Sequence, residues 1–150
     1  MLKSVWGQVG FPSLSQSLSA LNHLRRWQPS LIHEELQCIL PEPSSSLSEA
    51  YRILKPAGSL ILAIIDKDTE LGRTYEAMKA SNKFYREATF YTTREVLALL
   101  RQVGFARIVA CQTIFSNPET MNAPDNVRDG YGEGAFVVLS ATKINQGKIE

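Results

Sequence analysis

Three charged residues follow the most apolar run of the sequence. Leu60–Ile65 is an uninterrupted apolar run, and Asp66, Lys67 and Asp68 come directly after it. If this run is a strand of a parallel sheet, the three residues lie at its carboxyl edge, where open α/β sheets place their ligands. A carboxylate there, Asp66 above all, can orient a substrate. The structural alternative is that Asp66 only ends the strand and that Asp68 or Thr69 caps the next helix.

A second stretch, Lys83–Tyr91, mixes aromatic and basic side chains. Such a mixture can stack on single-stranded nucleic acid. The formal net charge of +1 and the acidic residue inside the stretch weigh against a nucleic-acid partner. Aromatic side chains bury much apolar area, so the structural alternative packs Phe84 and Phe90 under a lid. Tyr85 and Tyr91 then form hydrogen bonds at its edge.

Metal and thiol chemistry find little support in the sequence. His23, His33 and Cys38 have spacings that match no standard metal site, so no metal ligand is assigned. The two cysteines, Cys38 and Cys111, lie far apart in the chain. We interpret them as free thiols in a reducing cytosol.

A glycine-rich segment, Gly130–Ala135, contains the pattern G-x-G-x-x-A. A dinucleotide fingerprint needs a strand before it and a helix N-terminus after it, so that backbone N–H groups meet the ligand. Here a loop precedes the glycines and an apolar, β-branched strand follows them. We therefore predict turn residues that lead into the final strand.

The elements around the apolar run form a consistent series. Apolar residues with helical spacing predict a helix that starts near Leu47, with a capping box of Ser46 and Glu49. Proline and glycine then predict a turn at Pro56–Gly58. A strand that is apolar on both sides, as Leu60–Ile65 is, must be covered on both faces, as in the parallel sheet of an α/β protein.

The later elements complete this picture. A helix is expected over Glu70–Ser81, and a second one after the capping-box pattern Thr92–Glu95, ending at Gly104. Phe105–Phe115 is expected to be a sheet-edge strand with Ile108, Ala110 and Ile114 on one side. A last strand is expected over Ala135–Thr142. Since only a loop separates the last two strands, they are predicted to form an antiparallel hairpin.

The stretch Glu49–Leu62, EAYRILKPAGSLIL, resembles the signature E-x-x-R-[VI]-L-K-P-G-G-x-L-x-[IV] of class I S-adenosylmethionine-dependent methyltransferases. It departs from the signature at Ala57, where the family has glycine, a change that is tolerable if this residue keeps a negative φ. The resemblance extends over about Leu47–Lys143. It implies an α/β fold with a partial Rossmann-like methyltransferase sheet, made of a parallel strand and a C-terminal antiparallel hairpin, preceded by a helical or irregular N-terminal segment.

The resemblance also implies a cofactor and a substrate side. The cofactor is S-adenosylmethionine, which the family holds with a Gly-rich loop after its first strand and an acidic residue that ends its second. Neither feature is found in this sequence; Gly7–Gly10 is a weak candidate. In the family, the region between the fifth strand and the last helix often covers the methyl acceptor. The substrate-side candidates are therefore Asp66, Phe84, Tyr85, Arg86 and Tyr91.

The N-terminal part of the chain has a different composition. Both tryptophans, both histidines and most serines precede Leu47, and no Asp precedes Asp66. Helices are expected over Leu14–Trp27 and Leu31–Leu40, followed by a linker at Pro41–Ser45. The family would have a strand just before the signature helix, and none is visible. A divergent helical cap and a reading-frame error upstream of about Leu47 both remain open.

These observations lead to a division of the chain and two functional hypotheses. Residues 1–46 form a divergent segment, 47–143 a methyltransferase-like C-terminal half and 144–150 a tail. The first hypothesis is a truncated S-adenosylmethionine-dependent methyltransferase with a small-molecule acceptor, in which proximity and orientation supply most of the catalysis. The second is a non-catalytic half-domain that binds a partner chain or itself. Both place the protein in the cytoplasm, without nucleic-acid or membrane partners, and no catalytic residue is assigned.

Overall fold

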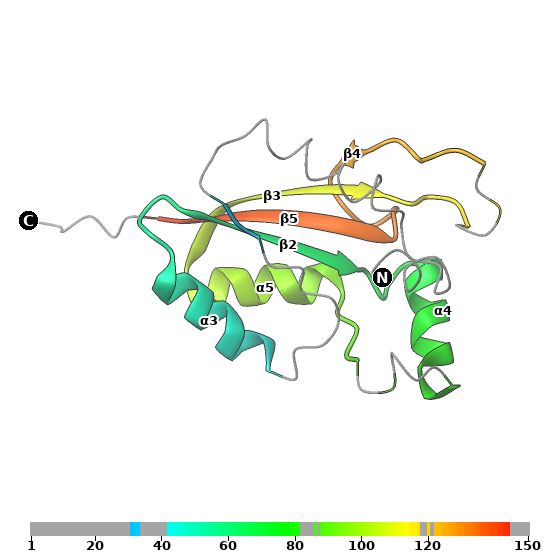
Figure 1. Cartoon of the computed structure of the whole chain (residues 1–150), viewed down its shortest axis with the longest axis horizontal. Coiled ribbons are helices and arrows are strands. Elements are labelled where there is room, and N and C mark those ends of the chain that lie inside the picture. The colour runs from blue at the N-terminus through cyan, green and yellow to red at the C-terminus, as the bar shows by residue number, and fades with distance from the viewer. Residues whose placement is uncertain are drawn as a thin grey trace, which may run out of the picture.

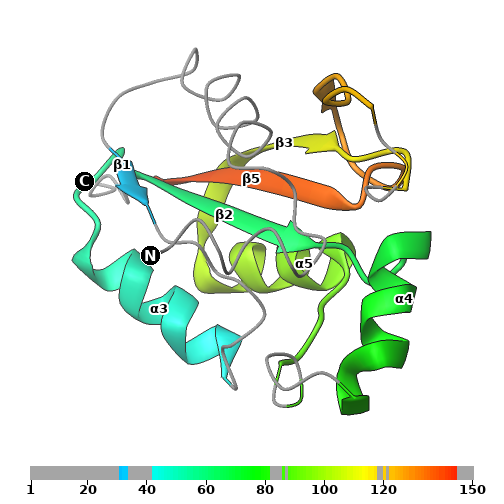
Figure 2. The same cartoon turned by 45° about the vertical axis from the view of Figure 1, so that its right-hand side comes forward.

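The computed structural model of the chain describes residues 42–81, 86, 88–117, 120 and 122–144, and the backbone of residues 31–33. Within this part, a five-stranded sheet of order β1-β2-β5-β3-β4 carries α3 and α5 side by side on one face, and α4 stands at the end where β2 terminates (Figures 1 and 2). The elements are β1 Leu31–His33, α3 Pro43–Ile53, β2 Ser59–Ile65, α4 Glu70–Met78, the 3-10 helix η1 Lys79–Ser81, α5 Thr93–Val103, β3 Phe105–Thr113, β4 Arg128–Asp129 and β5 Phe136–Lys143. The predicted α/β fold class is confirmed.

The sheet combines parallel and antiparallel pairs. Strand β2 runs parallel to β1 and antiparallel to β5, with a register from Ser59 opposite Thr142 to Ile65 opposite Phe136. Strand β5 also pairs antiparallel with β3. The predicted parallel strand and C-terminal antiparallel hairpin are thus both present. The predicted loop between the hairpin strands contains β4, which pairs with β3 and is too short to show a sequence period.

Strand β1 corrects two expectations for the N-terminal part. Leu31–His33 forms a strand parallel to β2, although a helix was predicted over Leu31–Leu40. The strand that the resemblance requires before the signature helix is therefore present. Its short apolar run is ambiguous by period alone, and its partner strand lies far along the chain. The helix predicted over Leu14–Trp27 and the glycines of Gly7–Gly10 lie outside the described residues.

Helix α3 begins earlier than the sequence suggested. It starts at Pro43, inside the predicted linker Pro41–Ser45, and no side chain caps its first turn. Proline is favourable at the first position of a helix, where its missing N–H has no intrahelical partner to lose. The predicted capping box of Ser46 and Glu49 is wrong, because Glu49 instead accepts from Arg52, one turn along, at 2.6 Å. This pair lies on the exposed face of the helix.

The turn after α3 places its unusual backbone conformation on an alanine. Ala57 has φ 63°, in the left-handed region, so the expectation that it keeps a negative φ is wrong. Gly58 is required for space instead, because a Cβ there would lie 2.8 Å from the carbonyl oxygen of Lys55. Backbone hydrogen bonds tie the turn to the end of β5: Ala57 N–H donates to Lys143 O, and Lys143 N–H donates to Gly58 O.

The side chain of Lys143 binds the C-terminal end of α3. Its ammonium donates to the carbonyl oxygens of Tyr51 at 2.7 Å and of Leu54 at 2.9 Å, and lies 4.8 Å from the centroid of the Tyr51 ring. A cation is favourable at the negative end of a helix dipole. Lys143 therefore joins the end of the last strand to the first described helix.

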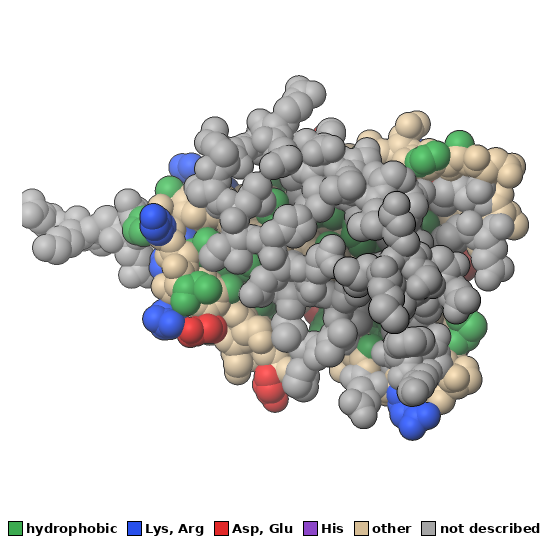
Figure 3. Space-filling model, in the orientation of Figure 1, with side chains coloured by type: hydrophobic (Ala, Val, Ile, Leu, Met, Phe, Trp, Pro, Cys, Tyr) green, Lys and Arg blue, Asp and Glu red, His purple; other side chains and the backbone are tan. Residues whose placement is uncertain are grey.

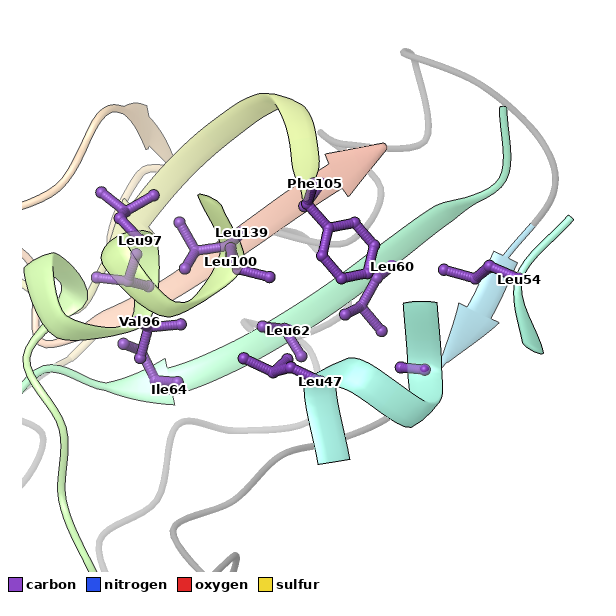
Figure 4. Close-up of a cluster of buried hydrophobic side chains, with 13 residues drawn as sticks. Leu47, Leu54, Leu60, Leu62, Ile64, Val96, Leu97, Leu100, Phe105 and Leu139 are labelled. Atoms are coloured by element: carbon purple, nitrogen blue, oxygen red, sulfur yellow. The ribbon is translucent and has the colours of Figure 1, made fainter. Parts of the chain in front are cut away.

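Apolar side chains pack on both faces of the sheet. On β2, Leu60, Leu62 and Ile64 face α3 and α5, whereas Ile61 and Ile65 face the other side. The α3–α5 cluster is drawn in Figure 4 and consists of Leu47, Ala50, Leu54, Leu60, Leu62, Ile64, Val96, Leu97, Leu100, Phe105, Val137, Leu139 and Ala141. The opposite cluster contains Tyr75 of α4 together with Phe90, Cys111 and Val138. The prediction that the apolar strand is covered on both faces is confirmed.

Strand β3 is irregular at two points. The register with β5 shifts between Ala106 and Val109, and Arg107 there has φ 48°, as in a β-bulge. Ile114, just after the strand, has φ 63° and packs in the cluster opposite to α3 and α5. The prediction that Ile114 shares a face with Ile108 and Ala110 is therefore wrong, because the backbone leaves the strand conformation before it.

The conformation of Ala57 predicts a stabilising substitution. Ala57→Gly removes the steric cost of a Cβ at positive φ and is expected to raise the free energy of unfolding by about 0.5–1 kcal/mol. Gly58→Ala is the matched control in the same turn and is expected to destabilise, because its Cβ meets the Lys55 carbonyl. Urea unfolding followed by circular dichroism measures both. A destabilised Ala57→Gly protein would contradict the left-handed turn.

The thiol of Cys111 is expected to be unreactive in the folded protein. Cys111 forms no disulfide and is fully buried, and burial, with a smaller effect of Asp129, raises the pKa of its thiol from 9.0 to about 11. The folded state thus favours the neutral thiol. The contribution of Cys111 to the free energy of unfolding is therefore complete below pH 9 and is lost as the pH rises towards 11. In a Cys38→Ser background, a disulfide reagent should label Cys111 roughly 100-fold or more slowly in native than in urea-unfolded protein. Equal rates would show that the site is open.

Candidate functional site

Asp66 ends β2 and is almost completely buried, at 2% exposure. One carboxylate oxygen, Oδ2, accepts a hydrogen bond from the Thr93 hydroxyl at 2.6 Å, and the other, Oδ1, accepts from the Asp68 backbone N–H at 3.0 Å. Buried carboxylates need such partners, since an unpaired charge in the interior is costly. Both oxygens of Asp66 are therefore engaged by donors of the chain itself.

The next residues cap helix α4. The Thr69 hydroxyl accepts from the Gly72 N–H at 3.2 Å and donates to the Asp66 carbonyl oxygen at 2.6 Å. Of the two caps predicted, Thr69 is the one observed. A Cβ at Gly72 would lie 2.1 Å from the Asp66 carbonyl oxygen, so this glycine makes room for the backbone of the strand end.

Helix α5 begins beside the same strand end with a capping box. The Thr92 N–H donates to Glu95 Oε2 at 2.7 Å, and the Glu95 N–H donates to the Thr92 hydroxyl at 3.1 Å, as predicted. The Thr92 backbone N–H, followed by the Lys67 ammonium and the Thr92 hydroxyl, holds the pKa of Glu95 below its ordinary value. Lys67 approaches Glu95 to 3.2 Å, so the turn after β2 and the first turn of α5 are also joined at the surface.

The candidate substrate-side residues are only partly brought together. The backbone N–H of Lys67 donates to the Tyr91 carbonyl oxygen at 3.3 Å, which places Tyr91 next to the residue that follows Asp66. The Tyr91 side chain is half-buried and packs against the α3–α5 cluster. Arg86 is exposed. Phe84 and Tyr85 lie outside the described residues.

Phe90, by contrast, belongs to the core. It is 3% exposed, and its ring stacks on Tyr75 of α4 with centroids 6.4 Å apart. Its neighbour in the sequence, Tyr91, packs on the opposite side of the sheet. The expectation that Phe90 packs is therefore confirmed, although it packs in the core against Tyr75 and not in a lid.

Sequence reasoning missed the partner of Asp66. Thr93 is a fully buried polar residue in the first turn of α5, and its hydroxyl makes the shortest contact to the Asp66 carboxylate. The only local signal is its place beside the capping threonine, Thr92. Without the sheet register, nothing in the sequence connects residues 66 and 93.

Metal and membrane sites are not found in the described part of the chain. No group of three or more His, Cys, Asp and Glu side chains there could hold a metal ion. Within the same residues, every helix is too short or too polar to cross a bilayer. On the face shown in Figure 3, the visible Lys and Arg side chains lie mostly at the left-hand edge, where an acidic side chain lies beside them.

The described residues do not complete a pocket for S-adenosylmethionine. The parallel strand β2 leads to α4 through Asp66–Thr69, whose polar groups bind one another and whose nearby glycine, Gly72, packs on the strand end. The segment Gly130–Ala135 lies between β4 and β5, as predicted for a turn, and no helix follows it. A Cβ at Gly134 would lie 2.6 Å from the Thr113 carbonyl oxygen, so this glycine too accommodates the chain's own backbone.

The signature residues themselves have structural roles. Glu49 and Arg52 form an exposed pair on α3, and Leu54 is buried in the α3–α5 cluster. Ala57 and Gly58 make the turn into β2. The signature therefore specifies how α3 joins the sheet, and it contributes no group with evident chemistry.

Comparisons with known proteins agree with this fold. The chain is similar to a crystal structure described as an S-adenosylmethionine-dependent methyltransferase, possible histamine N-methyltransferase, from Thermotoga maritima, with 44% identity and a TM-score of 0.68 over 71% of this chain and 51% of that chain. It is 44% identical over 102 residues to the uncharacterised protein MJ1123 of Methanocaldococcus jannaschii. This match covers 68% of this chain and 49% of the relative.

A third relative is the uncharacterised protein Rv2003c of Mycobacterium tuberculosis, 31% identical over 108 residues, with 69% of this chain and 38% of the relative covered. No protein-family model matches the chain. The chain thus spans about half the length, or less, of these three relatives. Its sheet, its signature and its 44% identity to the T. maritima protein relate it to the class I S-adenosylmethionine-dependent methyltransferases over a partial domain.

Proposed function

We propose that this chain is the C-terminal half of an S-adenosylmethionine-dependent methyltransferase domain and contributes its acceptor side. The observation that carries the proposal is the sheet β1-β2-β5-β3, with its parallel pair and antiparallel hairpin, at 44% identity to the T. maritima methyltransferase. In a complete domain the cofactor supplies the methyl group. The described residues of this chain supply the sheet edge and the connection before α5, next to which an acceptor would bind.

The acceptor is proposed to be a small molecule in the cytoplasm. The T. maritima protein is described as a possible histamine N-methyltransferase, which makes a small amine the first acceptor to test. Arg86 and Tyr91 are the described residues proposed to lie near it, together with Phe84 and Tyr85 of the same stretch. Asp66 lies at the same sheet edge, and its carboxylate oxygens accept hydrogen bonds from Thr93 and Asp68.

The second candidate function is a non-catalytic half-domain that pairs with another polypeptide or with itself. It is favoured by β1, which is three residues long and stands at the end of the described sheet. In the described part of the chain its other edge has no strand beside it, and such an edge is a template for strand addition.

Calorimetric titration with S-adenosylhomocysteine tests the first proposal. The purified full chain, shown to be folded by circular dichroism, is expected to give no saturable heat, because its described residues build no cofactor pocket. A chimera is then made by joining the chain to the part of the T. maritima protein that it does not match. The chimera is expected to bind one equivalent of S-adenosylhomocysteine, and homocysteine alone serves as the control ligand.

Three outcomes separate the possibilities. One-to-one binding by the chain alone would overturn the half-domain proposal in favour of an autonomous enzyme. A folded chimera that binds no S-adenosylhomocysteine would overturn the methyltransferase proposal. Sedimentation velocity of the chain alone addresses the second function, for which a concentration-dependent dimer is the expected result and a monomer at all concentrations speaks against self-association.

A further inference from the structure

The carboxyl end of β2 is a junction between several segments. The Asp66 N–H donates to the Ala135 carbonyl oxygen at 2.9 Å, which continues the sheet towards β5. The next N–H, of Lys67, donates to Tyr91 O at 3.3 Å, outside the sheet. Two adjacent amides therefore bind two different parts of the chain, the entry to β5 and the residues just before α5. In Figures 1 and 2, β2 ends between the starts of α4 and α5.

The Asp66 side chain adds a buried link to this junction. Its hydrogen bond with the Thr93 hydroxyl is short, at 2.6 Å, and Asp66 and Thr93 are 2% and 0% exposed. Hydrogen bonds to a charged, buried group contribute more than neutral ones. Removing the hydroxyl would leave Asp66 Oδ2 without this donor in a place that solvent hardly reaches.

Residues 88–92 have two kinds of attachment. Ala88 and Phe90 are buried in the cluster that also contains Tyr75. Polar attachments include the Lys67 N–H to Tyr91 O and, just beyond this segment, the Thr93 hydroxyl to the Asp66 carboxylate and the surface pair of Lys67 and Glu95. The second pair is buried and short, whereas the first is long, so the position of Tyr91 O above Lys67 depends on where Asp66 holds the start of α5.

We infer that Asp66 is a positioning residue that, through Thr93, holds residues 88–92 against the carboxyl end of β2. This inference rests on the proposed function, in which this segment, with Tyr91, lies on the acceptor side. Asp66 then acts on an acceptor indirectly, because it fixes the backbone of the segment that carries Tyr91, the residue proposed to lie near the acceptor. We call these two hydrogen bonds, Thr93 to the Asp66 carboxylate and Lys67 N–H to Tyr91 O, the clamp.

Amide hydrogen exchange of the Thr93→Val protein, resolved by residue with NMR, tests the clamp. The Lys67 amide reports the attachment to Tyr91, and the Asp66 amide reports the sheet bond to Ala135. Loss of the Thr93 hydroxyl is expected to speed exchange at Lys67 by about 10- to 100-fold through local opening, and at Asp66 by less than about threefold. Thr93→Ser keeps the hydroxyl and should return Lys67 exchange to within about threefold of the parent protein.

A matched control lies on α4. The Thr74 hydroxyl donates to the Glu70 carbonyl oxygen at 2.9 Å on the exposed face of that helix, so Thr74→Val removes a hydroxyl that plays no part in the clamp. It should leave exchange at both reporter amides unchanged. Thr93→Val is compared with it at the same temperature, after circular dichroism has shown that both proteins are folded.

The inference is overturned if Lys67 exchange does not rise in Thr93→Val, or if it rises by the same factor as Asp66 exchange. The second result would mean that Thr93 only stabilises the whole fold. It is also overturned if Thr93→Ser behaves like Thr93→Val, since the hydroxyl would then not be the group that matters. Exchange is measured without cofactor, so failure of the S-adenosylhomocysteine titration and failure of the clamp are separate results.

Discussion

The structure depends on the placement of β5 between β2 and β3. Along its length β5 exchanges hydrogen bonds with both neighbours, and Val137, Val138 and Leu139 at its centre are fully buried. Because successive side chains of a strand point to opposite faces, Val137 and Leu139 contact the helices while Val138 belongs to the other cluster. One strand near the end of the chain thus contributes side chains to both apolar clusters.

This arrangement explains why polar groups gather at the end of β2. The helices pack along the sheet through apolar side chains, but α4 and α5 both begin near the carboxyl end of β2, where their first N–H groups need partners. Thr69, Thr92 and Glu95 supply these partners. The Asp66 carboxylate accepts hydrogen bonds from Asp68, just before α4, and from Thr93, in the first turn of α5. Buried hydrogen bonds of this kind make one arrangement of the surrounding segments more favourable than others.

The sequence predicted what depends on local patterns and missed what depends on distant contacts. The stripe with Leu47 and Leu54, the apolar strand, the Thr92 capping box and the left-handed Gly104 follow from spacing and residue type within a few positions. These features account for α3, β2 and α5.

The failures have a common physical origin. Strand β1 is defined by its parallel partner rather than by its own three residues. Ala57 takes positive φ because both its N–H and the Gly58 carbonyl bind Lys143, at the far end of the chain. Thr93 was overlooked because its partner lies in another element. Of the candidate site, the edge position of Asp66 was foreseen, but the partners of its carboxylate were not.

The residues that relate this chain to the methyltransferases differ from those that would perform methyl transfer. Several signature positions have a structural task, such as the Glu49 pair, the buried Leu54 and the turn at Gly58. Glycines can leave room for a phosphate or a cofactor. At Gly72 and Gly134, however, backbone carbonyl groups of the chain itself occupy the space that a Cβ would take. The chain can therefore have the methyltransferase sheet although the polar groups at the end of β2 form hydrogen bonds with one another. Cofactor binding, rather than the fold, is therefore the property that decides what the chain does.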